Sequence, residues 1–160
     1  ADALHPEVAE AYRKAGVPAV LTPHAGEAGR LLGISPEEVA KDPLGAARAL
    51  AERTGLAVVL RGHPTVVAEG ERLSVNPTGN PALATGGTGD VLSGAIAALL
   101  AAGLSPFDAA RLGVFLHGLA GDLLAEEKEV GLLAREVAEA LPRARRLLQE
   151  GRVPPAFFPR

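Results

Sequence analysis

The sequence predicts an α/β fold built on a mostly parallel sheet that helices cover on both faces. Two short apolar runs, residues 17–21 and 56–60, have the length and composition of buried strands. Segments with helical spacing of apolar residues surround them. Buried strands that alternate with helices are typical of parallel sheets in α/β domains.

The remaining elements follow from caps, turns and periodicity. Helices are expected at residues 6–16, 25–32, 36–53 (with Pro43 as a break point), 88–102, 105–127 and 134–149. Ser35 to Glu38 is a capping box with a Pro at the first helical position. Glu69 to Glu71, between residues 65–68 and 72–75, predicts a hairpin turn. This is a thin sheet for so many helices, so we expect further strands upstream that are missing here or are supplied by another chain.

Composition narrows the functional classes. The 160 residues are 48% hydrophobic, enough for one globular domain, which we place at residues 1–150, followed by a Pro-rich tail at 151–160. The absence of Cys excludes disulfides, thiolate metal sites and Cys nucleophiles. A net charge of −3 with one Tyr and no Trp disfavours a nucleic-acid surface. No apolar run is long enough to span a bilayer.

Two features of the composition bear on origin. The chain has no Met and begins at Ala1, so we expect it to be a piece of a longer protein. It also has no Cys and only two Asn, and its Arg outnumber its Lys, a composition that resembles thermophile proteins.

The glycine-rich segment Thr85 to Asp90 is the strongest chemical signal. Its three Gly let the backbone adopt positive φ and approach a ligand closely. The predicted helix that follows presents N–H groups and a partial positive charge to an anion. The segment fits neither a Walker A loop nor a dinucleotide fingerprint. We therefore interpret it as a phosphate or oxyanion site.

Asp90 follows the last Gly of that loop, at the rim of the expected anion site. A carboxylate there could accept the proton of a hydroxyl that attacks phosphorus, an effect worth about 10²–10⁴-fold in rate. Alternatively, Asp90 only caps the helix and the Gly make a tight turn. Asn76 and Asn80, the only two Asn, flank the loop, where they serve either a ligand or the turn before each Pro.

Two further segments lie at predicted strand ends, where open parallel sheets bind ligands. In Thr22 to Glu27, His24 and Glu27 are expected to face the crevice; alternatively they only begin a helix. In Leu60 to Thr65, Arg61 could pair with a phosphate, or be an ordinary surface Arg at a turn.

Taken together and in this order, these segments resemble the ADP/ATP-dependent NAD(P)H-hydrate dehydratases, a ribokinase-like family. The resemblance rests on Asp2-Ala3-Leu4, on T-P-H-x-G-E at Thr22 to Glu27 and on L-K/R-G-x-x-T at Leu60 to Thr65. It continues through N-x-T-G-N-P-x-x-A-T-G-G-S/T-G-D-V-L at Asn76 to Leu92 and ends with L-H-G-x-A-G-D at Leu116 to Asp122. It covers nearly the whole chain, and the Asn76 to Leu92 match is highly specific.

The resemblance implies a three-layer ribokinase-like fold, here truncated at its N-terminal side, and assigns roles. Asp90 is the expected catalytic base and contacts the hydrated nicotinamide. The expected substrate contacts are Asp90, His24, Glu27 and Asn80. The expected nucleotide contacts are Arg61, Gly62, His63, Pro64, Thr65, Gly86, Gly87, Thr88 and Gly89. No residue is expected to bind a metal directly.

The implied activity is a lyase reaction of metabolite repair. Hydrated NADH or NADPH (NADHX or NADPHX) is dehydrated to NAD(P)H at the expense of ADP or ATP, and ADP yields AMP and phosphate. Mg²⁺ is expected to bridge the phosphates. The resemblance also implies a cytoplasmic homo-oligomer with no nucleic-acid or membrane partner.

Two departures from the family pattern keep alternatives open. Position 61 is Arg where the family usually has Lys. Family members also extend well upstream of Asp2, so the chain corresponds to the C-terminal portion of the catalytic domain. The alternatives are a ribokinase-like small-molecule kinase, for example of a thiamine precursor, or an inactive nucleotide-binding fragment.

Overall fold

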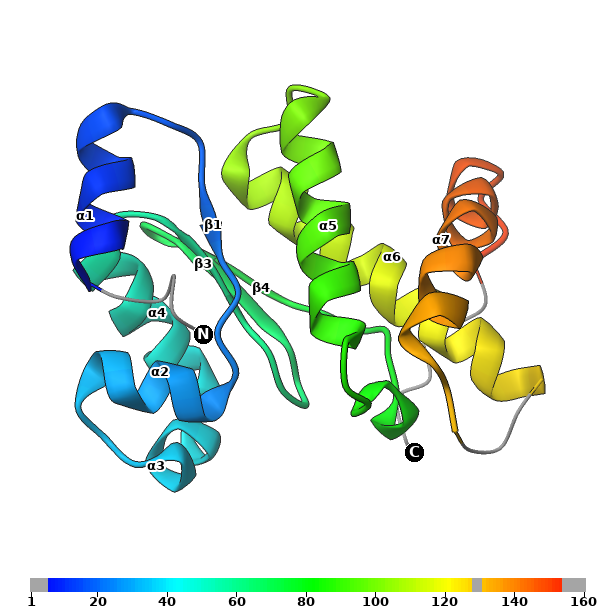
Figure 1. Ribbon diagram of the computed structural model, residues 1–160, viewed down its shortest axis with the longest axis horizontal. Helices are drawn as coiled ribbons and strands as arrows, with labels where there is room; N and C mark the ends of the chain where they lie inside the picture. Colours follow the sequence, from blue (N-terminus) through cyan, green and yellow to red (C-terminus); the bar gives the residue numbers. More distant parts are fainter. Residues whose placement is uncertain (1–5, 128–130, 154–160) are drawn as a thin grey trace. The chain divides into compact units, whose positions relative to one another are not determined.

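The computed structural model describes residues 6–127 and 131–153, which fall into two compact units (Figure 1). The first unit runs to Asn76 and includes Leu100–Arg111; the second comprises Pro77–Leu99 and the chain from Leu112 onward. Asp2 to Leu4, where the family resemblance starts, and residues 154–160 of the expected tail lie outside the described residues.

The predicted elements are present in the described residues. The first unit contains α1 (Pro6–Ala15), β1 (Val20–Leu21), α2 (Ala25–Leu32), α3 (Pro36–Lys41), α4 (Pro43–Thr54), β2 (Ala57–Leu60), β3 (Val66–Glu69) and β4 (Arg72–Val75). Then follow η1 (Pro81–Leu83), α5 (Thr88–Ala101), α6 (Pro106–Glu127) and α7 (Ala134–Gln149). The expected helix at 36–53 is two helices, because Asp42 ends α3 and its side chain caps α4 in front of Pro43.

The sheet has four strands in the order β1-β2-β3-β4. β1 pairs with β2 in parallel, with Val20 opposite Ala57, whereas β2–β3 and β3–β4 are antiparallel. The expectation of a mostly parallel sheet is therefore wrong for these strands. The connections explain the difference: α2, α3 and α4 lie between β1 and β2, a crossover long enough for parallel pairing, whereas β2, β3 and β4 follow one another through short turns.

The core of the first unit lies between α4 and the central strands, against which α4 packs (Figure 1). Leu50 of α4, Val58 and Val66 are fully buried within one apolar cluster. Val59 and Val67 alternate with these strand residues and are fully buried as well. Successive side chains of a strand point to opposite faces, so both faces of the β2–β3 pair are covered. For β2, the apolar run at residues 56–60 predicts this burial.

The second unit is helical, and α6 forms its centre. Leu116, Leu119 and Leu123 of α6 form one cluster with Val137 and Ala144 of α7. Leu83 and Val91, at the two sides of the glycine-rich loop, pack against the same cluster. The loop that precedes α5 is thus attached to a hydrophobic core at both of its ends. Among the described residues, no helix has the length and apolar character needed to cross a membrane.

Candidate functional site

The carboxyl ends of β1 and β2 bring His24 and Arg61 together. Because these strands are parallel, their ends meet at one edge of the sheet. The pairing continues beyond the strands: the Arg61 N–H donates to the Pro23 carbonyl at 2.8 Å, and His24 and Arg61 form a parallel bridge. The predicted crevice residues of two segments 37 positions apart (24 and 61) are therefore neighbours.

His24 begins α2 and caps it with its imidazole. The ring Nδ1 accepts hydrogen bonds from the backbone N–H groups of Gly26, at 3.0 Å, and Glu27, at 3.3 Å. In return, the Glu27 carboxylate accepts the His24 backbone N–H at 2.9 Å, which completes a capping box. Because Nδ1 is an acceptor, the proton of the neutral ring is on Nε2. His24 therefore begins the helix, as one of the two interpretations expected, and it is also exposed; its contact with substrate stays a prediction.

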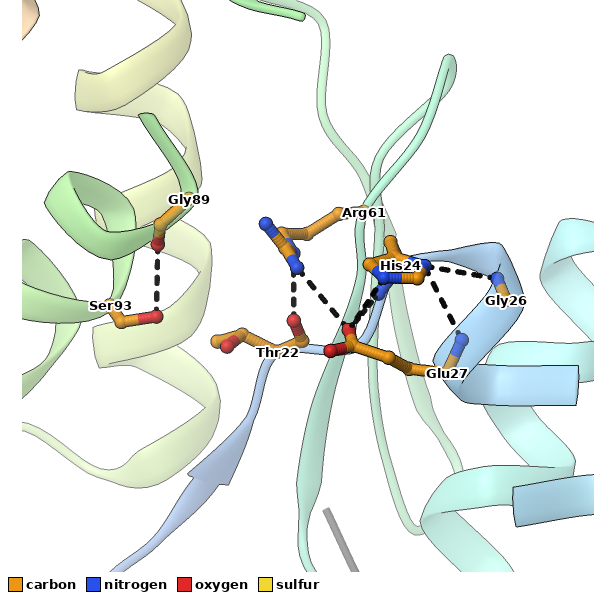
Figure 2. A network of polar contacts seen from close by, with 7 residues as sticks. All are labelled: Thr22, His24, Gly26, Glu27, Arg61, Gly89 and Ser93. Atoms are coloured by element: carbon orange, nitrogen blue, oxygen red, sulfur yellow. Dashed lines mark hydrogen bonds and ion pairs between the residues drawn. The ribbon is translucent and has the colours of Figure 1, made fainter. Parts of the chain in front are cut away.

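Glu27 is a buried carboxylate at the centre of this network, with only 5% of its surface exposed. Figure 2 shows its Oε2 facing both neighbours: Arg61 Nη2 lies 3.3 Å away, and His24 Nε2 3.5 Å away. Burial raises the pKa of the Glu27 carboxyl, but the His24 N–H bond, the electrostatic interaction with His24 and the Arg61 cation outweigh burial and hold the pKa below its ordinary value. Glu27 is therefore an internal counter-ion in the described structure. Its expected contact with substrate stays a prediction.

Arg61 is anchored on one side only. Its Nε donates to the Thr22 carbonyl at 2.7 Å and its Nη2 to Glu27, so two of the five guanidinium donors are engaged in these bonds. The side chain is 30% exposed. The following turn is closed by the Thr65 hydroxyl, which donates to the Gly62 carbonyl at 2.9 Å. A fixed, partly exposed guanidinium is suited to pairing with a phosphate.

The glycine-rich loop has the shape that the sequence predicts. Gly87 has a φ of +88°, which favours Gly, and α5 begins at the next residue, Thr88. Gly86 and Gly87 are exposed. Thr88 is 6% exposed, and its hydroxyl contacts the carbonyls of Leu83, at 2.7 Å, and Thr85, at 2.8 Å. The loop therefore presents glycine backbone to solvent at a helix N-terminus.

Asp90 is the third residue of α5, and it is exposed. Its backbone N–H donates to the Gly87 carbonyl at 3.1 Å, which ties the residue to the loop. One turn on, the Ser93 hydroxyl donates to the Gly89 carbonyl at 3.0 Å (Figure 2). The residue is thus exposed, and its backbone is tied to the glycine loop, a position from which a carboxylate can act as a general base.

The two Asn differ in what they do. The Asn76 backbone N–H donates to the Thr65 carbonyl at 2.9 Å, which extends the β3–β4 pairing. The Asn80 side chain is engaged at both ends: its Oδ1 accepts the Ala82 N–H at 3.0 Å, and its Nδ2 donates to Asp122 Oδ1 at 2.9 Å. Asn80 therefore has a structural task in the loop, and its contact with substrate stays a prediction.

The predicted site residues are divided between the two units. His24, Glu27 and the segment Arg61 to Thr65 belong to the first unit, whereas Asn80 and Gly86 to Asp90 belong to the second. Sequence reasoning assigned no role to His117 or Asp122, both of which contact the loop region. Their position in the L-H-G-x-A-G-D segment is the only signal that could have indicated them.

Comparison with known proteins assigns the chain to a family. The Carb_kinase family model, described as NAD(P)H-hydrate dehydratase, matches residues 1–143. A bifunctional NAD(P)H-hydrate repair enzyme of Thermofilum pendens is 51% identical over 135 residues, which are 83% of this chain and 26% of that protein.

Two solved structures share the fold. The ADP/ATP-dependent NAD(P)H-hydrate dehydratase of Bacillus subtilis, crystallised with ATP and Mg²⁺, has a TM-score of 0.77 and 39% identity, over 81% of this chain and 48% of that chain. A ribokinase-like superfamily protein of Enterococcus faecalis has a TM-score of 0.67 and 31% identity, over 88% of this chain and 50% of that chain. The ribokinase-like fold is confirmed. The chain spans between about a quarter and a half of the length of these relatives. It belongs to the NAD(P)H-hydrate dehydratase family.

Proposed function

We propose that the protein catalyses the dehydration of hydrated NADH and NADPH to NADH and NADPH, with ADP or ATP as co-substrate. The observation that carries the proposal is the exposed Asp90 beside a glycine backbone at the start of α5, in a chain of this family. The T. pendens relative is named as a repair enzyme for the same hydrates, and the B. subtilis relative as an ADP/ATP-dependent dehydratase.

The proposed chemistry combines phosphoryl transfer with elimination. Asp90 accepts the proton of the substrate's ring hydroxyl while that oxygen attacks the terminal phosphorus of ADP, and the P–O bond to AMP breaks. The C–O bond then breaks, phosphate leaves, and loss of a proton from the neighbouring ring carbon restores the dihydropyridine. ADP thus yields AMP, phosphate and NAD(P)H.

The glycine backbone supplies electrostatic stabilisation in this scheme. Negative charge develops on the phosphoryl oxygens as the nucleotide bond breaks. The N–H groups of Gly86, Gly87 and Gly89 and the N-terminus of α5 carry partial positive charge. The helix dipole stabilises an anion there by about 0.3–1 kcal/mol at an exposed site, and by more when the site is partly buried. The exposure of Gly86 and Gly87 supports access of the phosphates to them.

His24 and Arg61 are proposed to bind rather than react. Arg61, with Gly62 to Thr65, is assigned to the adenine nucleotide, and His24 to the dinucleotide substrate. Their anchoring supports this assignment: Glu27 and the Thr22 carbonyl fix the guanidinium, and the helix start fixes the imidazole. Side chains that already have their binding orientation lose less conformational entropy when a ligand binds.

Mg²⁺ is proposed as a partner of the nucleotide phosphates. Among the described residues, no group of three or more His, Asp or Glu is placed to hold a metal ion. The proposal places the ion on the substrate phosphates and water, a mode of binding that Mg²⁺ commonly prefers to an all-protein cage. When bound, the ion neutralises phosphate charge. The cytoplasmic location and the homo-oligomer expected from the family resemblance belong to the same proposal.

The test uses the intact protein. Hydrated NADH is incubated with ADP and Mg²⁺, and the absorbance of the restored dihydropyridine is followed. We expect the signal to require all three components. The proposed function would be contradicted if the folded protein binds ADP but restores no dihydropyridine with either ADP or ATP.

A further inference from the structure

The segment Leu116 to Asp122 of α6 takes no part in the proposed chemistry, yet it is the surface on which the loop before α5 rests. Phe115, Gly118 and Asp122 have the spacing i, i+3 and i+7, which places them along one side of a helix. Each contacts a different part of residues 78–80. The contacts extend over two turns of α6, so the loop is attached at several points.

Two Gly of α6 allow the loop to come close. A Cβ added at Gly118 would lie 2.3 Å from the Thr78 hydroxyl oxygen and 2.7 Å from the Thr78 carbonyl carbon. A Cβ at Gly121 would lie 2.6 Å from the Leu83 side chain. The Thr78 hydroxyl donates to the Phe115 carbonyl at 2.9 Å across the same contact. The helix therefore receives the loop backbone at a distance that only Gly permits.

Asp122 holds the first end of the loop with both carboxylate oxygens. Its Oδ2 accepts the Gly79 backbone N–H at 2.8 Å, and its Oδ1 accepts Asn80 Nδ2 at 2.9 Å. Asn80 connects Asp122 with η1, because its Oδ1 accepts the Ala82 N–H at the start of that helix. Hydrogen bonds to an ionised acceptor are shorter and stronger than neutral ones.

His117 holds the other end. The residue is 8% exposed, and its Nε2 lies 2.9 Å from the Thr88 carbonyl oxygen. A carbonyl only accepts, so Nε2 donates this bond. The Thr88 hydroxyl in turn contacts the Leu83 and Thr85 carbonyls, which connects this end of the loop with η1. His117 and Asp122 thus constrain the chain on either side of Gly86 and Gly87.

We propose that Asp122 and His117 are positioning residues that fix the glycine backbone and Asp90 for phosphoryl transfer, and that Asn80 acts as the link between Asp122 and η1. The inference rests on the proposed function for its kinetic consequence, but its structural part stands alone. Neither residue is proposed to touch substrate. Displacement of a reacting group by about 1 Å can reduce a rate by about 10²-fold, so the loss of such a support is measurable.

The donor pattern of the Asp122–Asn80 pair allows a test by exchange. Asp122→Asn replaces one of the two accepting oxygens by a donor, so one N–H group faces another. Asn80→Asp places two carboxylates at the 2.9 Å contact. With both changes, the amide at position 122 accepts from Gly79 and donates to the carboxylate at position 80, which still accepts from Ala82. Only the double variant restores every bond.

The experiment measures kcat, KM for ADP and KM for hydrated NADH for both single variants and the double variant of the intact protein. Each single variant is expected to lose about 10- to 100-fold in kcat, with a smaller change in KM for hydrated NADH. The double variant is expected to recover most of kcat. Glu126→Gln, an exposed carboxylate one turn further along α6, is the matched control and should stay within about twofold of the unchanged protein.

His117 has its own pair of variants. His117→Gln keeps an amide that can donate to the Thr88 carbonyl, whereas His117→Leu removes the donor and leaves that bond of the carbonyl unmade. The Gln variant is expected to retain more kcat than the Leu variant. Equal activity of the two would overturn the role of His117.

Amide hydrogen exchange separates this inference from the proposed function. Asp122→Asn is expected to speed exchange at Gly79 and through residues 82–89, and the double variant to reverse the change. Were the intact protein without dehydratase activity, the proposed function would fail, and the exchange data alone would decide the positioning role. Full activity of Asp122→Asn, unchanged exchange in that variant, or a double variant no better than the worse single variant would each overturn it.

Discussion

The two regions proposed to bind anions are built in physically different ways. At the strand ends, the groups of His24 and Arg61 are side chains held by a buried carboxylate, Glu27. At the start of α5, the proposed groups are the backbone N–H of Gly86, Gly87 and Gly89, in a loop whose ends contact α6. Side-chain groups depend on charge and protonation, whereas backbone groups depend on the absence of Cβ atoms and on the support of the loop. The two regions should therefore fail for different reasons when mutated.

Substitution of Asp90, at the start of α5, is expected to have the largest effect on activity. Asp90→Asn removes the proposed base but keeps the side-chain shape, so we expect kcat to fall by about 10²–10⁴-fold while ADP still binds. Steady-state kinetics and calorimetric titration with ADP measure the two effects.

Asp108→Asn is the matched control for that variant. Asp108 is likewise exposed and is the third residue of its helix, α6. Both changes remove a carboxylate that favours the helix dipole, worth about 0.3–1 kcal/mol in stability. Equal losses of kcat in the two variants would show that Asp90 only stabilises the start of α5 and does not act as a base.

The strand-end region should be sensitive to charge. Arg61→Ala removes the guanidinium partner of the buried Glu27 carboxylate, which keeps its hydrogen bond from the His24 N–H. Loss of one partner of a buried charged group costs about 1–3 kcal/mol in stability. The midpoint of urea unfolding measures the loss, and Arg48→Ala, an exposed Arg on α4, is the control. Adding Glu27→Gln to Arg61→Ala should recover part of the stability. Additive losses would show that Glu27 and Arg61 are not coupled.

The glycine-rich loop should lose stability when a methyl group is added to one of its glycines by substitution with Ala. Gly87 has a φ of +88°, and a Cβ there would lie 3.1 Å from the Ala134 side chain. Gly87→Ala should therefore cost about 1–2 kcal/mol in stability and weaken ADP binding. Gly94→Ala, in the interior of α5 with open space around the added Cβ, should instead be neutral or stabilise by up to about 1 kcal/mol. Equal unfolding midpoints for the two variants would contradict this account of the loop.

The smallest expected effect is the pH dependence of the stability that Glu27 contributes at the strand ends. The pKa of Glu27 is lowered by folding, so its contribution to stability is fully present above the ordinary value of 4.5 and is lost as the pH falls through the folded value. Glu27→Gln removes this titration. The difference in Tm between the unsubstituted protein and Glu27→Gln should become smaller as the pH is lowered from about 7 to about 3. A difference that is constant over this range would contradict the role of Glu27 as a charged counter-ion.

Local signals predicted most of the elements and the loop. A capping box with a Pro at the first helical position located the start of α3, and the glycine spacing located the loop at the start of α5. β1 is shorter than the apolar run because its pairing with β2 is confined to Val20 and Leu21. The sheet was predicted as mostly parallel because burial on both faces is shared by parallel strands and by the β2–β3 pair of this sheet.

Side-chain pairs between distant segments could not be predicted from periodicity. Glu27 was expected to face a crevice, but Arg61, 34 residues away, makes it an internal counter-ion. Asn80 was recognised as unusual, but its partner Asp122 is 42 residues away on another helix. No pattern of apolar spacing records which polar groups meet across such separations.

The central claim of the proposed function is that the phosphoryl group moves to the substrate hydroxyl and then departs as phosphate. The direct measurement is the fate of phosphate, followed by ³¹P NMR during the reaction of the intact protein with hydrated NADH, ADP and Mg²⁺. We predict one AMP and one free phosphate for each dihydropyridine restored. A product that keeps the phosphate on the acceptor, with no dihydropyridine formed, would identify a small-molecule kinase and contradict the account.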